Sequence, residues 1–257
     1  MRFQLIRNAT LKLAYAGRNI LVDPYFAPRH SLPSYTGRSA NPLVDLPLPV
    51  EDILDGIDLV VVSHLHSDHF DSVAKSRLPK NMPIICQPGN EGDIEGAGFS
   101  RVMPLIDVLD WQGLHFSRCA ASHGLGPVVE IMGQVMGFVL RAEAEPCLYW
   151  AGDTVLYPPV LATVALERPD VIVTHSCGAL WDGSLIVMDT DQTLSLFHAA
   201  HAAGEGTKVI VTHMDCLDHA TVTRADLLEA VRQNAIPEDR FHVPQDGEIL
   251  EVSAPGT

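Results

Sequence analysis

The sequence has few positive charges and no long apolar run, and both absences limit what the protein can do. Its 257 residues include 17 lysines and arginines against 32 aspartates and glutamates, a formal net charge of −15. Nucleic-acid partners are therefore disfavoured, because such partners are bound through basic surfaces. In the first 13 residues, MRFQLIRNATLKL, charges interrupt every apolar stretch. We therefore expect neither a secretory leader nor a membrane partner.

Cysteine is also scarce, and no two cysteines form a Cys-x-x-Cys pair. The five thiols are scattered along the chain, at Cys86, Cys119, Cys147, Cys177 and Cys216. An odd number of scattered thiols is typical of reducing conditions, so we expect a cytoplasmic protein. Each cysteine is interpreted as a small buried apolar residue.

The apolar content allows a large core, since 47% of the residues are hydrophobic. Layered α/β folds of this size are commonly one domain, so we expect a single domain over residues 1–257. Alternating apolar and polar residues predict an antiparallel hairpin over residues 3–23, with a turn at Gly17. Residues 24–50 contain six prolines and are too long for an ordinary connection. This segment is predicted to be a loop that walls a pocket.

The rest of the chain alternates between short apolar runs and helical patterns. Strands are predicted over residues 58–62, 83–87, 102–108, 114–120, 137–142, 147–151, 171–173, 209–211 and 248–252. Helices are predicted over residues 72–77, 89–96 and 191–203, and another is predicted to open at Thr223. Thr223 and Asp226 have the spacing of a capping box with aspartate in place of glutamate.

The segment His64-Leu65-His66-Ser67-Asp68-His69 is the most informative part of the chain. It directly follows the predicted strand over residues 58–62, so three imidazoles and a carboxylate lie on a loop held by a buried strand. A single loop histidine is more often solvated or a helix cap. The close repetition of imidazole and carboxylate instead favours a site for zinc, iron or manganese.

Three further ligand types stand just beyond predicted strands. His123, Asp153 and His213 each follow an apolar run. Taken singly, each is as readily explained by a structural role. Their recurrence at the same topological place favours convergence at one sheet edge, because layered α/β folds build their sites there.

In this order, the segments resemble the metallo-β-lactamase superfamily. The matching elements are Leu21-Val22-Asp23-Pro24, His64-x-His66-x-Asp68-His69, His123, Gly152-Asp153-Thr154 and His213. A looser resemblance, over residues 8–11, 42–47 and 213–221, is to the small metal-dependent hydrolases that include L-ascorbate-6-phosphate lactonase-like proteins. The resemblance implies an α/β fold, a four-layer αββα sandwich with the site at one edge.

The resemblance also implies how two divalent ions would be held. His64, His66 and His123 would bind the first ion, and Asp68, His69 and His213 the second. Asp153 would bridge the two. Zinc is the first expectation, with manganese and iron as alternatives.

Three other polar residues are predicted to lie near the site. Asp23 is expected to orient an imidazole through a hydrogen bond. For His175 and His219, three roles stay open: contact with substrate, support of the metal ligands, and a structural role. His198 and His201, three apart on a predicted helix, are interpreted as solvent-facing or packing residues.

The resemblance implies hydrolysis of an ester-like bond, in a lactone or phosphoester of a small polar metabolite, by a hydroxide that bridges two ions. Asp68 is the candidate catalytic residue, which would orient the water or accept its proton. His66 stands where flavodiiron sites have glutamate, which argues against an oxygen-reducing site of that type. The extra domain and basic arm of RNA-processing members have no evident counterpart, which argues against a nuclease. A mononuclear iron oxidoreductase of the sulfur dioxygenase type is one alternative, and a non-catalytic metal-binding or sensing protein is another. Whether the protein forms a homo-oligomer is left open.

Overall fold

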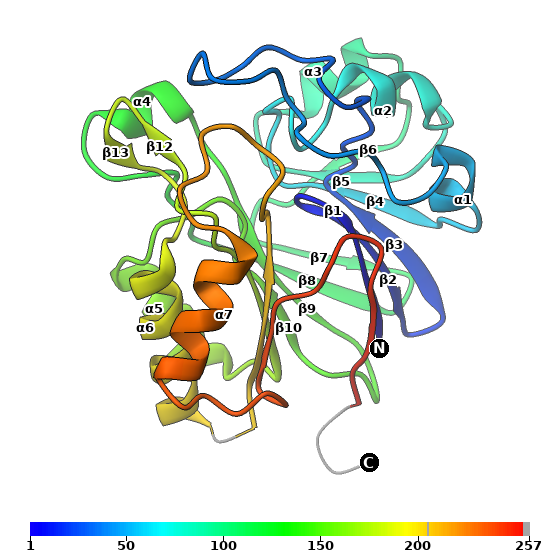
Figure 1. The fold of residues 1–257 in the computed structure, drawn as a ribbon. Coiled ribbons are helices and arrows are strands. Elements are labelled where there is room, and N and C mark those ends of the chain that lie inside the picture. Colours follow the sequence, from blue (N-terminus) through cyan, green and yellow to red (C-terminus); the bar gives the residue numbers. More distant parts are fainter. Residues whose placement is uncertain (205, 254–257) are drawn as a thin grey trace.

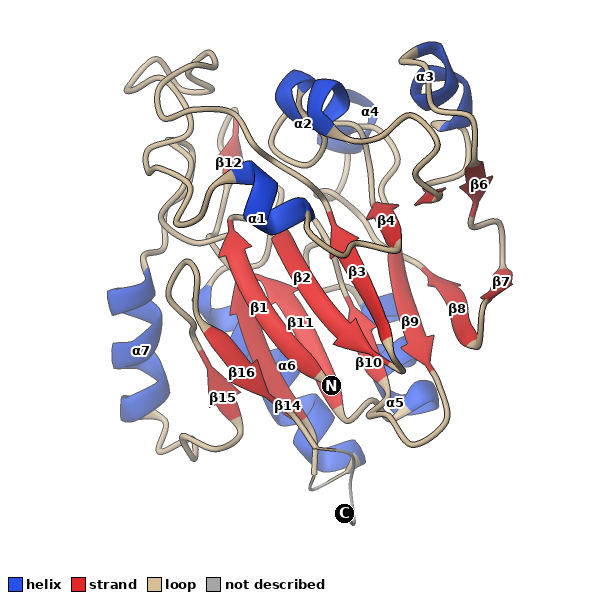
Figure 2. Ribbon diagram, turned by 90° about the vertical axis from the view of Figure 1, so that its right-hand side faces the viewer, coloured by secondary structure: helices blue, strands red, loops and turns tan. Residues whose placement is uncertain are grey.

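Two seven-stranded sheets form the centre of the protein (Figure 1). The computed structural model describes residues 1–204 and 206–253. The strand order is β16-β1-β2-β3-β4-β5-β6 in the first sheet and β15-β14-β11-β10-β9-β8-β7 in the second. Figure 2 looks onto the first sheet, with the second sheet behind it.

The strands of the first sheet are β1 (Arg2–Arg7), β2 (Thr10–Tyr15), β3 (Arg18–Val22), β4 (Leu59–Val62), β5 (Ile84–Cys86), β6 (Val102–Pro104) and β16 (Ile249–Glu251). Those of the second are β7 (Val108–Trp111), β8 (Leu114–Cys119), β9 (Gly137–Arg141), β10 (Leu148–Trp150), β11 (Val171–His175), β14 (Lys208–Thr212) and β15 (Phe241–His242). A small hairpin joins β12 (Leu180–Trp181) to β13 (Ser184–Leu185). The helices are α1 (Val50–Leu54), α2 (Ser72–Arg77), α3 (Glu91–Gly96), α4 (Val128–Met132), α5 (Pro158–Glu167), α6 (Thr190–Ala203) and α7 (Arg224–Gln233).

Alternate side chains of the buried strands build three apolar layers, as the two-residue period of a strand requires. On β4, Val61 packs between the sheets, while Val60 packs outward against α1, α2 and α3. On β11, Val173 packs between the sheets, while Ile172 packs outward against α5, α6 and α7. Helices therefore cover both outer faces (Figure 1). The predicted four-layer αββα sandwich is confirmed.

Two strand predictions are wrong. The predicted hairpin is a three-stranded meander, because the chain also turns at Asn8, which adopts φ 56°. The predicted strand over residues 102–108 is two strands in different sheets: β6 pairs with β5, and β7 pairs with β8. Residues 105–107 cross between the sheets after Pro104, whose ring nitrogen has no hydrogen to donate to a strand pairing.

Other local predictions are confirmed. Helix α2 has the predicted bounds, and α6 begins one residue earlier than predicted. The capping box at α7 forms, with Thr223 and Asp226 bonded reciprocally. Helices α1, α4 and α5 were not predicted, because their segments lack a clear apolar period. Among the described residues, no helix is long and apolar enough to cross a membrane.

Candidate metal centre

Seven side chains form two groups that share one carboxylate. Within each group the ligand atoms lie within 4.8 Å of one another, and all of the residues but His66 are buried. The first group is His64, His66, His123 and Asp153. The second is His69, Asp153, His175 and His213. Asp153 is thus the residue that both groups share, and its role as a bridge between two ions stays a prediction.

Each of these residues lies at or just beyond the end of a strand. His64, His66 and His69 follow β4, whereas His123, Asp153, His175 and His213 follow or end β8, β10, β11 and β14. Strands β10, β11 and β14 are parallel neighbours, so their carboxyl ends meet at one edge of the second sheet. Strand β4 supplies the facing ligands from the first sheet. The predicted convergence at a sheet edge is confirmed.

Asp153 lies at the centre of the cluster. Its Oδ2 is 3.2 Å from His69 Nε2, 3.3 Å from His123 Nε2 and 3.7 Å from His64 Nε2. Two ligand atoms that each lie about 2.1 Å from one tetrahedral zinc ion are about 3.4 Å apart. The spacing of these donors therefore fits a metal ion.

Hydrogen bonds on the far side of the imidazoles aim their free nitrogens at the centre. Asp23 lies 2.9 Å from His69 Nδ1, as predicted, and also accepts bonds from the Ser63 amide and hydroxyl. His123 Nδ1 donates to the Ile186 carbonyl at 2.8 Å. The buried Nε2 atoms of His64 and His69 have no hydrogen-bond partner among the described residues. An ion would satisfy these otherwise unpaired nitrogens.

The electrostatics of the cluster also favour bound cations. Burial alone raises the pKa of the Asp153 carboxyl, but His69, His213 and His123 hold it well below its usual range. Burial lowers the pKa of His69, yet Asp153, Asp68 and Asp23 raise it to about 10. The carboxylates therefore attract positive charge, for which protons and divalent ions compete. The donor set fits divalent metal ions.

The second group differs from the implied one in one residue. His175 belongs to it, with Nδ1 2.5 Å from Asp153 Oδ1. Asp68 lies beside the group: its Oδ2 is 3.0 Å from His213 Nε2 and 3.5 Å from His69 Nε2. A ligand role for Asp68 stays a prediction. The sequence could not place His175 because its direction depends on which face of β11 it occupies.

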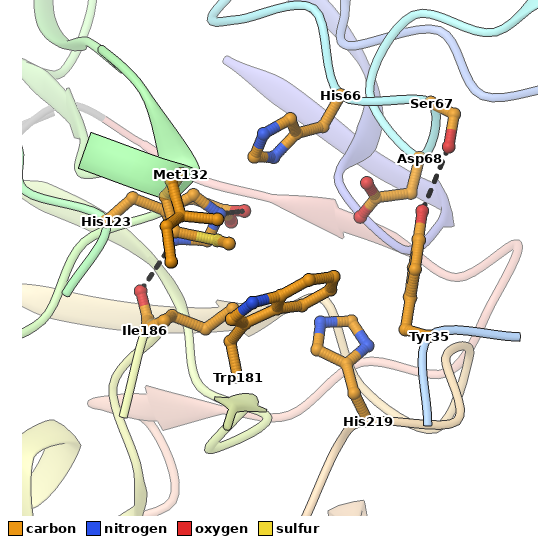
Figure 3. Close-up of a pocket in the computed structure, with 11 residues that line it drawn as sticks. Tyr35, His66, Ser67, Asp68, His123, Met132, Trp181, Ile186 and His219 are labelled. Atoms are coloured by element: carbon orange, nitrogen blue, oxygen red, sulfur yellow. Dashed lines mark hydrogen bonds and ion pairs between the residues drawn. The ribbon is translucent and has the colours of Figure 1, made fainter. Parts of the chain in front are cut away.

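A cavity of about 210 Å³ opens onto the cluster (Figure 3). In Figure 3, His66 and Asp68 lie on one side of it, and Trp181 and His219 lie opposite. Its lining is Tyr35, His66, Ser67, Asp68, His123, Ile131, Met132, Asp153, Trp181, Ile186 and His219. Tyr35 comes from the proline-rich loop, so the prediction that this loop walls a pocket is confirmed. Tyr35 and Trp181 were missed because a single aromatic residue carries no motif.

The two helix histidines lie outside the site, as predicted. His198 and His201 are exposed on α6, and both rings contact Phe197. Neither belongs to the two ligand groups.

Comparison with known proteins agrees with the fold and the site. Residues 18–214 match the family described as the beta-lactamase superfamily domain. The UPF0173 protein YddR of Bacillus subtilis is 35% identical, over 96% of this chain and 98% of that protein. A UPF0173 metal-dependent hydrolase of Xanthobacter autotrophicus is 25% identical, over 67% of this chain and 70% of its own length.

Two solved structures are similar over nearly the whole chain. One, described as "a possible metal-dependent hydrolase" from Veillonella parvula, has a TM-score of 0.92 and 31% identity, covering 98% of this chain and 99% of its own. The other, an isothiocyanate hydrolase from Delia radicum gut bacteria, has a TM-score of 0.91 and 31% identity, covering 99% of this chain and 100% of its own.

Proposed function

The chain belongs to the beta-lactamase superfamily and to its UPF0173 metal-dependent hydrolases, and from this we propose that it hydrolyses a small uncharged electrophile. An isothiocyanate is the first candidate substrate and a neutral lactone the second. We further propose two divalent ions, zinc first and manganese or iron as alternatives, because the ligands form two groups that share Asp153.

The lining of the cavity carries this proposal. Among the described residues, no lysine or arginine lines the cavity, so none of their side-chain cations is placed there to bind a phosphate group. One wall is instead apolar, built by Ile131, Met132, Trp181 and Ile186. At about 210 Å³, the cavity is smaller than most small-molecule sites, which span roughly 300–1,000 Å³. These features favour a small neutral molecule with an apolar substituent over a phosphoester.

The similarity to a solved isothiocyanate hydrolase supports the first candidate. Hydrolysis of R–N=C=S consumes one water: a carbon–oxygen double bond forms at the central carbon, the double bond from that carbon to nitrogen breaks, the R–N bond stays, and the nitrogen takes both hydrogens. The products are the amine R–NH₂ and carbonyl sulfide. A lactone would consume one water and open to a hydroxy acid.

Bound divalent ions would supply an acidified water and polarise the heteroatom on the reacting carbon. The residues of the chain orient the imidazoles and hold the substrate. Asp23 and the Ile186 carbonyl orient His69 and His123, while the apolar wall excludes water and receives the substituent. Asp68, which lines the cavity, is proposed to orient the attacking water.

The two sequence-based alternatives are less well supported. A mononuclear iron oxidoreductase needs one ligand group, whereas the described residues form two. The relatives are named hydrolases, which favours turnover over sensing. The narrower resemblance to L-ascorbate-6-phosphate lactonase-like proteins stays a prediction.

The test is a substrate panel with metal-loaded protein. A small isothiocyanate, a neutral lactone and a phosphomonoester would be compared with and without chelator, and metal content would be counted per chain. We expect the neutral substrates to be turned over at least tenfold faster than the phosphomonoester, and chelator to abolish the reaction. A His198→Ala variant is the matched control, since that ring lies outside the site. Preference for the phosphomonoester would contradict the proposal.

A further inference from the structure

One wall of the cavity is polar and is not part of the ligand groups. It is formed by Tyr35, Ser67 and His219. His219 is 7% exposed, and its buried Nδ1 has no hydrogen-bond partner among the described residues. The other ring nitrogen, Nε2, has no hydrogen-bond partner among the described residues either, but it is not buried, so it is the nitrogen that a molecule in the cavity can reach.

Tyr35 holds the His219 ring from the side. The two rings are 4.8 Å apart between centroids, with an interplanar angle of 84°. The Tyr35 hydroxyl is 2.9 Å from Ser67 Oγ, on the loop that also carries the metal ligands (Figure 3). The phenol therefore spans from the histidine loop to His219.

Asp218 ties this wall together. It directly precedes His219, and its side chain binds the proline-rich loop on both sides of Tyr35. The Tyr35 and Thr36 amides donate to its two oxygens at 3.0 and 3.1 Å, and the Asn41 side-chain amide donates at 2.9 Å. The hydroxyls of Ser34 and Thr36 donate to Oδ2 as well. One carboxylate thus sets the position of Tyr35 relative to His219.

We propose that His219 hydrogen-bonds the substrate heteroatom on which negative charge develops, and that Asp218 is the positioning residue that holds His219 and Tyr35 in place. This inference deepens the proposed function and rests on it. The apolar wall at Trp181 would take the substituent, so the substrate lies between that wall and His219.

The charge state of His219 suits this role. Burial lowers its pKa to about 4, against the opposing effect of Asp68, so the ring is neutral near pH 7. A neutral imidazole has one nitrogen that donates and one that accepts. It can therefore bind a polar atom of an uncharged substrate without adding a charge that would repel the metal ions.

The first experiment replaces the ring nitrogens and keeps the ring. His219→Phe is expected to lower kcat/KM at least tenfold for the isothiocyanate and the lactone, with unchanged metal content and thermal midpoint. The loss should grow as the departing heteroatom becomes more basic, because the bond then stabilises more charge. His198→Phe is the matched control. A loss below threefold across the substrate series would overturn the inference.

A binding experiment separates this inference from the proposed function. A lactam, which resembles a lactone but resists hydrolysis, would be titrated by calorimetry into metal-loaded wild-type protein and the His219→Phe variant. We expect at least tenfold weaker binding to the variant. If the wild type bound the lactam at least tenfold more tightly than the variant but hydrolysed none of the panel, the proposed function would fail while the contact with His219 would stand. Equal binding to both proteins would refute the inference.

The second variant tests the positioning role. In Asp218→Asn, one oxygen acceptor becomes a donor that faces the Ser34 and Thr36 hydroxyls and the Thr36 amide. We expect KM to rise more than kcat falls, and amide exchange at Tyr35 and Thr36 to quicken, with metal content unchanged. Asp71→Asn alters another buried aspartate, which accepts the amides of Phe26, Val73 and Ala74, and it should leave exchange at Tyr35 and Thr36 unchanged. Wild-type KM together with wild-type exchange would overturn the role of Asp218.

Discussion

Replacing Asp23 by asparagine should weaken metal binding without removing a ligand. Asp23 is fully buried, and its Oδ1 accepts the Ser63 amide at 2.7 Å. Its Oδ2 meets both the Ser63 hydroxyl at 2.7 Å and His69 Nδ1 at 2.9 Å. Asparagine that keeps the first bond places an NH₂ group against His69 Nδ1. That nitrogen must then give up its proton, so the proton moves to Nε2, the atom that should face the metal.

The size of the effect follows from these contacts. Loss of a partner that orients a metal-binding histidine typically costs 10–100-fold in affinity, or about 1.4–2.7 kcal/mol. Two hydrogen bonds to a charged acceptor are also weakened, at about 1.5–3 kcal/mol each, so the free energy of unfolding should fall by roughly 3 kcal/mol or more. Zinc affinity would be measured by competition with a chromogenic chelator, and stability by denaturant unfolding of the metal-free protein.

Asp71→Asn is the matched control for this prediction. Asp71 is 2% exposed and accepts three backbone amides, from Phe26, Val73 and Ala74, but no imidazole. It should lose stability and keep zinc affinity within about threefold of wild type. If the two variants had the same zinc affinity, the reasoning about the His69 tautomer would be refuted.

Four further outcomes are expected. Asp153→Ala should reduce both metal content and turnover by at least tenfold, because it removes the carboxylate shared by the two groups. His198→Ala should match wild type in both. Metal analysis measures the content, and an equal loss of metal in the two variants would contradict the ligand assignment. Chelation should lower the thermal midpoint, since ions that bind only the native state stabilise it, and an unchanged midpoint would exclude that coupling. Thr223→Ala should cost about 1 kcal/mol in denaturant unfolding through loss of the capping box, with Thr163→Ala as the comparison. Burial raises the pKa of Asp218, but hydrogen bonds from Ser34, Thr36 and Asn41 hold that pKa below its usual range. The difference in unfolding free energy between wild type and Asp218→Asn should therefore be full above the unfolded-state pKa of about 3.9 and shrink on further acidification. A difference that stayed constant with pH would be inconsistent with an ionised Asp218.

Local chemistry explains which site predictions succeeded. His64, His66 and His69 lie in one six-residue segment, 64–69, close behind a β-branched run, so their proximity follows from chain connectivity alone. His123, Asp153 and His213 could be added because each follows a buried strand, and strand ends in a layered α/β fold meet at an edge. The orienting role of Asp23 was predictable for a similar reason, since β3 runs parallel to β4 and ends beside the histidine loop.

Most of the strands, the chemical type of the candidate ligands and the edge at which they gather could be predicted from the residues alone, because apolar period and residue type act over a few neighbouring residues. The contacts between distant segments could be seen only in the folded protein. It placed His175 against Asp153, set Asp68 beside His213, and brought Tyr35 to His219 through Asp218. These pairs are separated by 22 to 184 residues, and their meeting depends on strand order, on which face of a strand a side chain occupies and on how a long loop is tethered. No local pattern records those three quantities, because each is set by the packing of the whole chain.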